Sequence, residues 1–286
     1  MSTTDGDLDL RLDCVRERLR GLGSVLVAFS GGADSALVLA LAHECLGDRA
    51  VAAMGLSAAY PEDEVAAARG TAAHIGVRMV EVASGQLEDP AFLRNDSMRC
   101  YHCRDDLFGT LLPVAAREGL AHLCDGTNAD DLGDDRPGRR AAAEAGVISP
   151  LAEAGLTKAQ VREGSRQLGL PTWDKPQQAC LSSRIPRGTP ITVGALRRVE
   201  QAEMWLRGKG FGQLRVREHG AVARIELPAE DILRLASEPL RSQCAAALRE
   251  LGYAFVSVDL EPFVTGRLSR APEVAAGGPD VAAADG

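Results

Sequence analysis

The sequence has no excess of positive charge and no long apolar run, and these absences exclude several classes of protein. It carries 32 Lys and Arg against 40 Asp and Glu, a formal net charge of −8, so it does not attract nucleic acid in bulk. Charges or glycines interrupt every apolar stretch before it is long enough to span a bilayer. Residues 1–9 lack the basic and apolar regions of a signal peptide. We therefore expect a cytoplasmic protein with no membrane or nucleic-acid partner.

A disulfide framework is also not expected, because a cytoplasmic protein keeps its seven cysteines reduced. Four of them stand in helical or strand-like patterns, and we expect them to pack in the core, as free cysteine often does. These four are Cys14, Cys45, Cys124 and Cys244. The other three stand in different surroundings and are candidates for function, namely Cys100, Cys103 and Cys180.

The length of 286 residues and a hydrophobic content of 45% suffice for two domains with buried cores. Strand-like and helix-like segments alternate from Val25 to Cys124, which predicts an α/β fold with a doubly wound parallel sheet. After residue 193 the pattern changes to that of a smaller α+β domain. We expect a nucleotide-binding domain over 1–170, a loop over 171–192 that carries Cys180, a substrate or oligomerisation domain over 193–271, and a disordered tail over 272–286.

The segment from Ser30 to Ser35 has the features of a phosphate-binding loop. Gly31 and Gly32 let the backbone approach a phosphate, and the helix that follows turns its positive end toward the anion. Ser30 and Ser35 can donate hydroxyl hydrogen bonds, whereas Asp34 would repel phosphate and more naturally holds Mg²⁺ or orients the loop. The Gly-Lys-Ser/Thr ending of a Walker A loop is missing. The loop therefore predicts nucleotide binding of another type.

Three further segments carry candidate residues. Asp125 to Asp131 follows a strand end, where ligands bind in open α/β sheets, and Gly126 and Asp131 are its candidates for nucleotide binding. Arg99 to Arg104 contains Cys100 and Cys103 in a spacing that lets two thiols share a metal. Ala179 to Gly188 places Cys180 beside Arg184 and a second arginine, neighbours that favour a reactive thiolate.

The phosphate loop resembles the PP-loop of the ATP pyrophosphatases, which release pyrophosphate and AMP. Together with Asp174 to Pro176, the segments just described identify the chain as resembling the LarE family of sulfur transferases, over about Val25 to Asp259. The resemblance implies that ATP adenylylates a carboxylate of pyridinium-3,5-biscarboxylic acid mononucleotide. A sulfur nucleophile then displaces AMP and leaves a thiocarboxylate for the nickel-pincer cofactor of lactate racemase. It also implies a homo-oligomer and transient contact with other proteins of that cofactor pathway.

The family has two ways to supply the sulfur. In one branch a cysteine at the position of Cys180 gives up its sulfur and becomes dehydroalanine. In the other, three cysteines hold a [4Fe-4S] cluster that carries an extra sulfide, and this sequence has all three, at 100, 103 and 180. Three thiolates leave one iron open for sulfide, so the cluster is the hypothesis taken forward. A structural zinc with His102 as fourth ligand, and Cys180 acting alone, are the alternatives.

The candidate substrate site lies in the C-terminal part. Arg215 and Arg217 alternate along a predicted strand and therefore share one face, where they could clamp a substrate phosphate. The resemblance adds Glu203 and Glu226 as acidic positions near the substrate. Arg184, in the aperiodic stretch around Cys180, is a further candidate for binding the substrate. A solvated charged strand face is the simpler alternative. Two other functions stay open: another PP-loop enzyme, such as a tRNA thiolase or an NAD synthetase-like ligase, and a nucleotide sensor without catalysis.

Overall fold

The computed structural model describes residues 3–133, 137–176 and 179–264, and the chain divides into two compact units. The first unit comprises Met1–Asp89 and Met98–Ala179, and the second comprises Pro90–Ser97 and Cys180–Gly286. The tail expected over 272–286 lies outside the described residues. In the described part, no helix combines the length and the apolar character that a membrane span requires.

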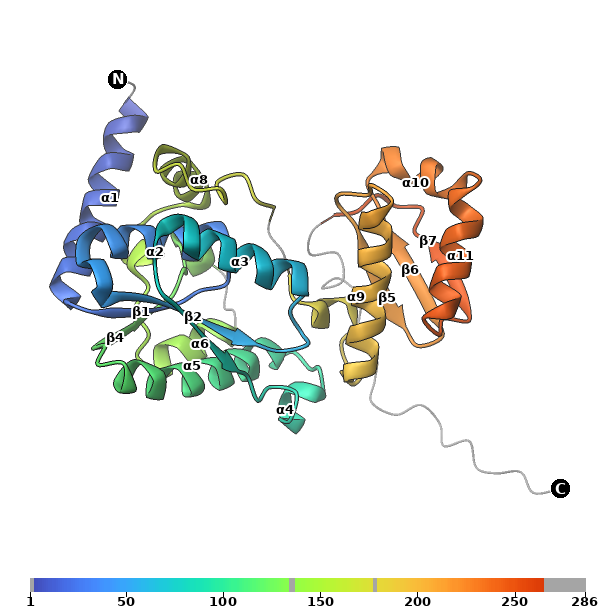
Figure 1. Cartoon of the computed structure of the whole chain (residues 1–286), viewed down its shortest axis with the longest axis horizontal. Coiled ribbons are helices and arrows are strands. Elements are labelled where there is room, and N and C mark those ends of the chain that lie inside the picture. The colour runs from blue at the N-terminus through green and yellow to red at the C-terminus, as the bar shows by residue number, and fades with distance from the viewer. Residues whose placement is uncertain (1–2, 134–136, 177–178, 265–286) are drawn as a thin grey trace. The chain divides into compact units, whose positions relative to one another are not determined.

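A parallel four-stranded sheet forms the centre of the first unit (Figure 1). Its strands are β1 (Val25–Ala28), β2 (Ala50–Leu56), β3 (Met79–Ala83) and β4 (His122–Cys124), in the order β3-β2-β1-β4. Each neighbouring pair is parallel. The predicted doubly wound α/β fold is confirmed.

Helices cover both faces of this sheet, with α2 and α3 on one side and α5 and α6 on the other (Figure 1). The bounds are α1 (Thr3–Leu22), α2 (Ala33–Leu46), α3 (Glu62–Ile75), α5 (Arg99–Arg117), α6 (Pro137–Glu144), α7 (Pro150–Glu153) and α8 (Lys158–Gln167). Short 3₁₀ helices occupy Gly47–Arg49 (η1) and Ala129–Gly133 (η2). Both faces of the strands are therefore buried, as expected for a parallel sheet.

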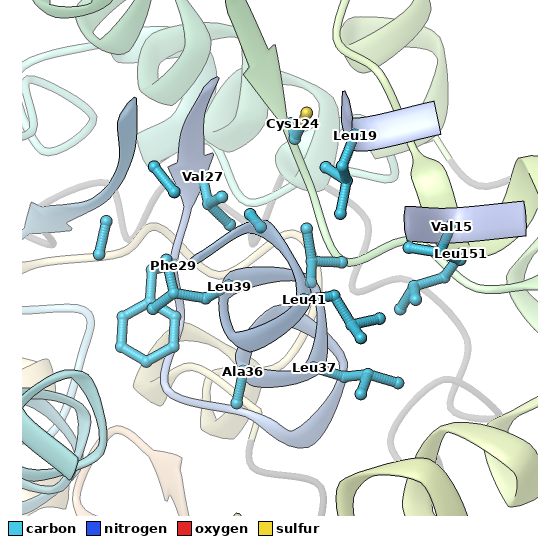
Figure 2. Packing of buried hydrophobic residues seen from close by; sticks show 14 of the residues in the cluster. Val15, Leu19, Val27, Phe29, Ala36, Leu37, Leu39, Leu41, Cys124 and Leu151 are labelled. Atoms are coloured by element: carbon cyan, nitrogen blue, oxygen red, sulfur yellow. The ribbon is translucent and has the colours of Figure 1, made fainter. Parts of the chain in front are cut away.

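Successive side chains of β1 point to opposite faces of the sheet and pack in two separate cores. Val25 and Val27 pack with α1, α2 and α8, whereas Leu26 packs with Phe108 and Leu111 of α5. Figure 2 shows the first of these cores around α2, whose side chains are apolar on almost every side. Such a helix is stable only when it is buried on all sides, so α2 and the loop before it are held firmly.

The order of the strands creates a switch point next to β1. The chain proceeds from β1 outward through β2 to β3 and then returns to place β4 on the other side of β1. Ligands of open α/β sheets bind where the strand order reverses, beyond the carboxyl ends of the strands. The segments after β1 and β4, which are the phosphate loop and the Asp125 turn, meet at this point.

The second unit is a smaller α+β arrangement. Its sheet pairs β5 (Arg215–His219) antiparallel with β6 (Val222–Glu226), and β6 parallel with β7 (Phe255–Val258). Its helices are α4 (Pro90–Leu93), η3 (Leu181–Arg184), α9 (Val193–Gly208), α10 (Ala229–Ala236) and α11 (Leu240–Glu250). Residues of α9, α10, α11, β5 and β6 form its core, and partly buried residues of β7 pack against it.

The short segment around α4 belongs to the second unit although it lies far away in sequence. Asn95 is fully buried there, and its amide donates to the carbonyls of Pro186 (2.8 Å) and Thr189 (2.9 Å). The Ile191 amide in turn donates to the Leu93 carbonyl at 2.9 Å. These bonds fix the segment that follows Cys180.

A capping box formed by Thr157 and Gln160 begins α8. The expectation for the four core cysteines is only partly correct. Cys124 and Cys244 are buried and Cys45 is half-buried, but Cys14 is exposed on α1. The pattern fails at Cys14 because the buried side of α1 carries larger residues such as Leu12 and Val15.

Candidate functional site

The phosphate loop connects the end of β1 to the start of α2 and is held by its own serines. The Ser35 hydroxyl accepts from the Ser30 amide (3.2 Å), donates to the Gly32 carbonyl (3.2 Å) and lies 3.1 Å from the Ser30 hydroxyl. Gly32 caps α2 and has no side chain to bond the first amides of the helix. Those amides and the helix dipole are therefore available to an anion.

The two glycines of the loop have different reasons to be glycine. Gly31 has a φ of +71°, and a Cβ there would lie 2.6 Å from the Cβ of Ala68 on α3, so the fold itself excludes a side chain. Gly32 has an ordinary φ of −86°, and among the described residues a Cβ there would meet only the Ser30 hydroxyl, at 3.4 Å. The space beside Gly32 is thus open to a ligand.

Asp34 connects the phosphate loop to the rest of the switch point. One carboxylate oxygen accepts from the Asn128 side chain at 3.0 Å, and the other forms an ion pair with Lys158 at the start of α8. A carboxylate that already holds one cation is suited to orienting the loop. It is also the type of ligand that Mg²⁺ prefers.

The turn after β4 is organised by Asp125, which is almost completely buried. Its carboxylate accepts from the Thr127 amide (3.1 Å) and hydroxyl (2.7 Å) and from the Ser149 hydroxyl (2.7 Å). It also pairs with Arg104 of α5 at 2.8 Å. Every one of these groups donates to Asp125, so its carboxylate is held in a fixed position in the turn.

Gly126 and Asp131, the two nucleotide-binding candidates of this segment, occupy different places. A Cβ on Gly126 would lie 2.6 Å from the Ser35 amide nitrogen, so this turn is in direct contact with the phosphate loop. Asp131 lies in η2 and accepts from the Asn128 amide at 3.2 Å, which makes it a support of the turn that holds Asp34.

Two lysines that the sequence did not single out reach the phosphate loop. Lys158 pairs with Asp34, and Lys175 donates to the Gly31 carbonyl at 3.1 Å while pairing with Glu64 of α3 at 2.7 Å. Lysine ammonium groups beside a phosphate loop neutralise phosphate charge as point charges. The only sequence signal was position, since Lys158 opens a helix with a recognisable cap and Lys175 lies in the segment Asp174 to Pro176.

The thiol pair belongs to the first unit. Cys100 is exposed and Cys103 half-buried, and they stand three residues apart in the first two turns of α5, where such positions share a face. The Tyr60 hydroxyl lies 3.8 Å from the Cys103 sulfur. Two thiols on one helix face fit the donor chemistry of an iron–sulfur or zinc site.

Cys180 belongs to the second unit and precedes η3. Its carbonyl accepts from the Ser183 amide and from the Arg184 guanidinium, both at 3.0 Å. Within the described residues, no group of three or more His, Cys, Asp or Glu side chains is gathered that could hold a metal ion. Of the three cysteines in the cluster hypothesis, Cys100 and Cys103 therefore stand together in the first unit, and Cys180 belongs to the second.

Arg184 and Glu203 form a fully buried ion pair in the second unit. The guanidinium donates to both carboxylate oxygens, at 2.9 and 3.0 Å, and Glu203 also accepts from Arg207 (2.9 Å) and the Val216 amide (3.0 Å). Burial by itself raises the pKa of Glu203, but the Arg184 charge and these hydrogen bonds hold it below its usual value. Because Val216 belongs to β5, the pair is bonded directly to the backbone of that strand.

Arg215 and Arg217 lie on the same buried side of β5, yet they have different partners. Arg217 pairs with Glu226 at 2.7 Å and donates to the Ser183 carbonyl, while its Nε is buried without a hydrogen-bond partner among the described residues. Arg215 donates only to the Leu214 carbonyl, at 2.7 Å, and no carboxylate in the described part of the chain pairs with it. The alternative of a solvated strand face is wrong, because both arginines are more than nine-tenths buried.

The surroundings of Arg215 disfavour its charge, although its guanidinium carbon lies 5.1 Å from the centre of the Phe263 ring. Burial, and then repulsion from Arg184, lower the pKa of Arg215 to about 10. A buried cation with no carboxylate partner among the described residues would be stabilised by an anion that binds beside it. Glu203 and Glu226 are completely buried and engaged with arginines, so we expect both to act on a ligand through those arginines.

Comparison with known proteins places these features in context. An asparagine synthase family model matches residues 8–102. An uncharacterised protein of Synechocystis is 41% identical over 92% of this chain and 98% of its own length. The pyridinium-3,5-bisthiocarboxylic acid mononucleotide synthase of Lactiplantibacillus plantarum is 36% identical over 88% of this chain and 91% of its own. An argininosuccinate synthase of Halobacterium salinarum is 32% identical over 52% of this chain and 40% of its own.

Proposed function

Because this chain belongs to the LarE family of ATP-dependent sulfur transferases, we propose that it converts carboxylates of pyridinium-3,5-biscarboxylic acid mononucleotide into thiocarboxylates for a nickel-pincer cofactor. The observation that carries the proposal is the junction of the phosphate loop with the Asp125 turn at the switch point of the sheet. Both family segments meet there, at the place where an α/β sheet binds a nucleotide.

The first step would be adenylylation. A carboxylate oxygen of the substrate attacks the α-phosphorus of ATP, and pyrophosphate leaves with the bonding electrons. Amides at the start of α2 and the hydroxyls of Ser30 and Ser35 would bind the departing phosphates. Lys158 and Lys175 would neutralise their charge. Asp34 and Asp131 are the carboxylates that would hold Mg²⁺, which supplies further neutralisation when it is bound.

The substrate mononucleotide would be held in the second unit through its phosphate. Arg215 is the residue best suited to this, because it is buried and has no carboxylate partner among the described residues. Arg217 would contribute its unpaired Nε. The Arg184 guanidinium is engaged with Glu203 and also donates to the Cys180 carbonyl. Its contribution would be to hold the backbone of Cys180 and the first turn of η3 in place.

In the second step a sulfur nucleophile attacks the acyl carbon, and AMP leaves with the bonding electrons. We propose that Cys100, Cys103 and Cys180 hold a [4Fe-4S] cluster, which would supply the sulfur atom when it is loaded. The thiol pair on α5 supports this, since a sacrificial Cys180 would need neither Cys100 nor Cys103. The alternative with Cys180 as sulfur donor gives the same product. Formation of a homo-oligomer stays a prediction.

The experiment that tests the function measures AMP and pyrophosphate with ATP and the biscarboxylate mononucleotide, in the presence of a sulfur source. We expect AMP release to depend on the mononucleotide and the product to gain sulfur in place of oxygen by mass spectrometry. AMP release that depends instead on tRNA, or on an acid-amide substrate of ligases, would contradict the proposal. Binding of ATP without any turnover would favour a nucleotide sensor.

A further inference from the structure

Arg104 links the thiol pair to the nucleotide site within the first unit. It directly follows Cys103 on α5, and its guanidinium donates to the Asp125 carboxylate at 2.8 Å. The guanidinium carbon also lies 5.9 Å from the centre of the Phe108 ring. Asp125 is 3% exposed and stands at the carboxyl end of β4. The bond therefore runs from the helix that carries both thiols to the sheet edge that carries the nucleotide loops.

Contacts surround both ends of this bond, although the Arg104 side chain is 41% exposed and the Asp125 side chain only 4%. On the helix side, a Cβ on Gly138 of α6 would meet the Cys100 carbonyl and the Arg104 stem, each at 3.3 Å, so α6 lies directly against the first turn of α5. On the sheet side, Thr127 and Ser149 hold the Asp125 carboxylate with hydrogen bonds of 2.7 to 3.1 Å. Neither end can shift alone without breaking contacts.

The contacts continue from Asp125 to the phosphate loop. Gly126 is the next residue, and its α-carbon is so close to α2 that a Cβ would lie 2.6 Å from the Ser35 nitrogen. Asn128 of the same turn donates to Asp34. Any change that a nucleotide imposes on Asp34 and Ser35 thus reaches Asp125 through backbone contact and a hydrogen bond.

We propose that Arg104 is a positioning residue that couples nucleotide binding to the thiol pair: the bond from Arg104 to Asp125 holds the first two turns of α5 in place when the phosphate loop is occupied. The inference rests on the proposed function, because that function assigns Cys100 and Cys103 to sulfur transfer. Occupancy of the loop makes Cys100 and Cys103 less able to fluctuate outward. Sulfur is therefore presented in a fixed place only when an adenylylated substrate can form.

The test measures the alkylation rate of individual cysteines by iodoacetamide in the metal-free, reduced, full-length protein. Peptide mass spectrometry follows Cys103, with the exposed Cys14 of α1 as an internal reference. The nucleotide probe is α,β-methylene-ATP with Mg²⁺, which binds without turnover. We expect it to slow Cys103 alkylation relative to Cys14 by at least about fivefold, the lower end of ordinary coupling between two sites.

Variants assign the effect to the bond. Arg104→Gln should bring the nucleotide effect on Cys103 close to onefold while α,β-methylene-ATP still binds by calorimetry. Arg104→Lys keeps a cation and a donor for Asp125 and should retain the effect. The matched control is Arg78→Gln, which breaks an ion pair of 2.7 Å with Glu118 at the other end of α5 and should leave the effect unchanged.

Two results would overturn the inference: no nucleotide effect on Cys103 in the wild type, or an equal effect in Arg104→Gln. The measurement is independent of sulfur transfer. If the protein shows the coupling but forms no AMP with the pyridinium mononucleotide, the proposed function fails and the coupling stands. If it forms the product without the coupling, the role of Arg104 fails and the proposed function stands.

Discussion

Replacing Gly126 by alanine tests how closely the Asp125 turn and the phosphate loop fit together. The added Cβ would lie 2.6 Å from the Ser35 nitrogen, 2.9 Å from the Asp34 carbonyl carbon and 3.0 Å from the Ser35 α-carbon. All three atoms are backbone and cannot rotate away. Ordinary contact begins at 3.4 Å, so the loop must move by about 0.8 Å, a displacement similar to the misplacement that costs about 100-fold in catalysis.

We expect Gly126→Ala to lower kcat/KM for ATP, measured by AMP release, by about 100-fold. Overpacking of this kind also lowers the free energy of unfolding by about 1–3 kcal/mol, which thermal denaturation would register while the protein stays folded. Calorimetry with α,β-methylene-ATP separates lost binding from lost turnover.

The control is Gly109→Ala in α5, where a Cβ would meet no atom of the described residues within 4 Å. This change should raise the free energy of unfolding by up to about 1 kcal/mol, because alanine is the better helix former, and should leave AMP release unchanged. Wild-type ATP affinity and turnover in Gly126→Ala would show that the turn and the loop do not act as one site.

Three further predictions concern single residues of the two units. Gly32→Val should fold with a near-normal melting temperature but form no AMP, because its Cβ meets only Ser30 in the described part of the chain and the side chain would occupy the space that we assign to phosphate; normal AMP release would remove that assignment. Arg215→Met should abolish binding of the mononucleotide in calorimetry and raise the free energy of unfolding by about 1–3 kcal/mol, as replacement of a buried charge often does; unchanged binding would contradict the anion site. The pKa of Arg215 is lowered to about 10, so the buried guanidinium is charged below that pH and destabilises the folded wild type. Above pH 10 it loses its proton in the folded state and this cost falls. The stability gained by Arg215→Met should therefore shrink as the pH rises past 10. Burial raises the pKa of the Cys124 thiol to about 12, so iodoacetamide at pH 8 should label Cys14 and leave Cys124 intact, and rapid labelling of Cys124 in native protein would contradict its burial.

The sequence was sufficient for the parts of the fold that local patterns determine. The alternation of strands and helices from Val25 onward and the helix that follows the phosphate loop each leave a periodic or positional signal, and the structure has both. The start of α5 left no such signal. Met98 provides no side-chain cap, and the first two turns, with Cys100 and Cys103, are helical because residues further along the helix, such as Phe108, are anchored in the core.

Contacts between distant residues were beyond what the sequence could show. Lys158 looks like an ordinary exposed residue of a helix start, and its pairing with Asp34 depends on how α8 packs against α2. The arginines of β5 look like a solvated face, but Arg217 is buried in an ion pair with Glu226 of β6, and Arg215 is buried without a carboxylate partner among the described residues. Which of the two strand arginines lacks a carboxylate partner is set by strand register and could not be predicted.

The most direct test of the central claim is the intact mass of the protein before and after turnover. Protein reconstituted anaerobically with iron and sulfide should contain about four iron atoms, form several thiocarboxylate products per chain when sulfide is supplied, and keep its polypeptide mass unchanged. Iron-free protein that forms one product per chain and becomes lighter by the mass of one H₂S, with dehydroalanine at position 180, would contradict the cluster mechanism.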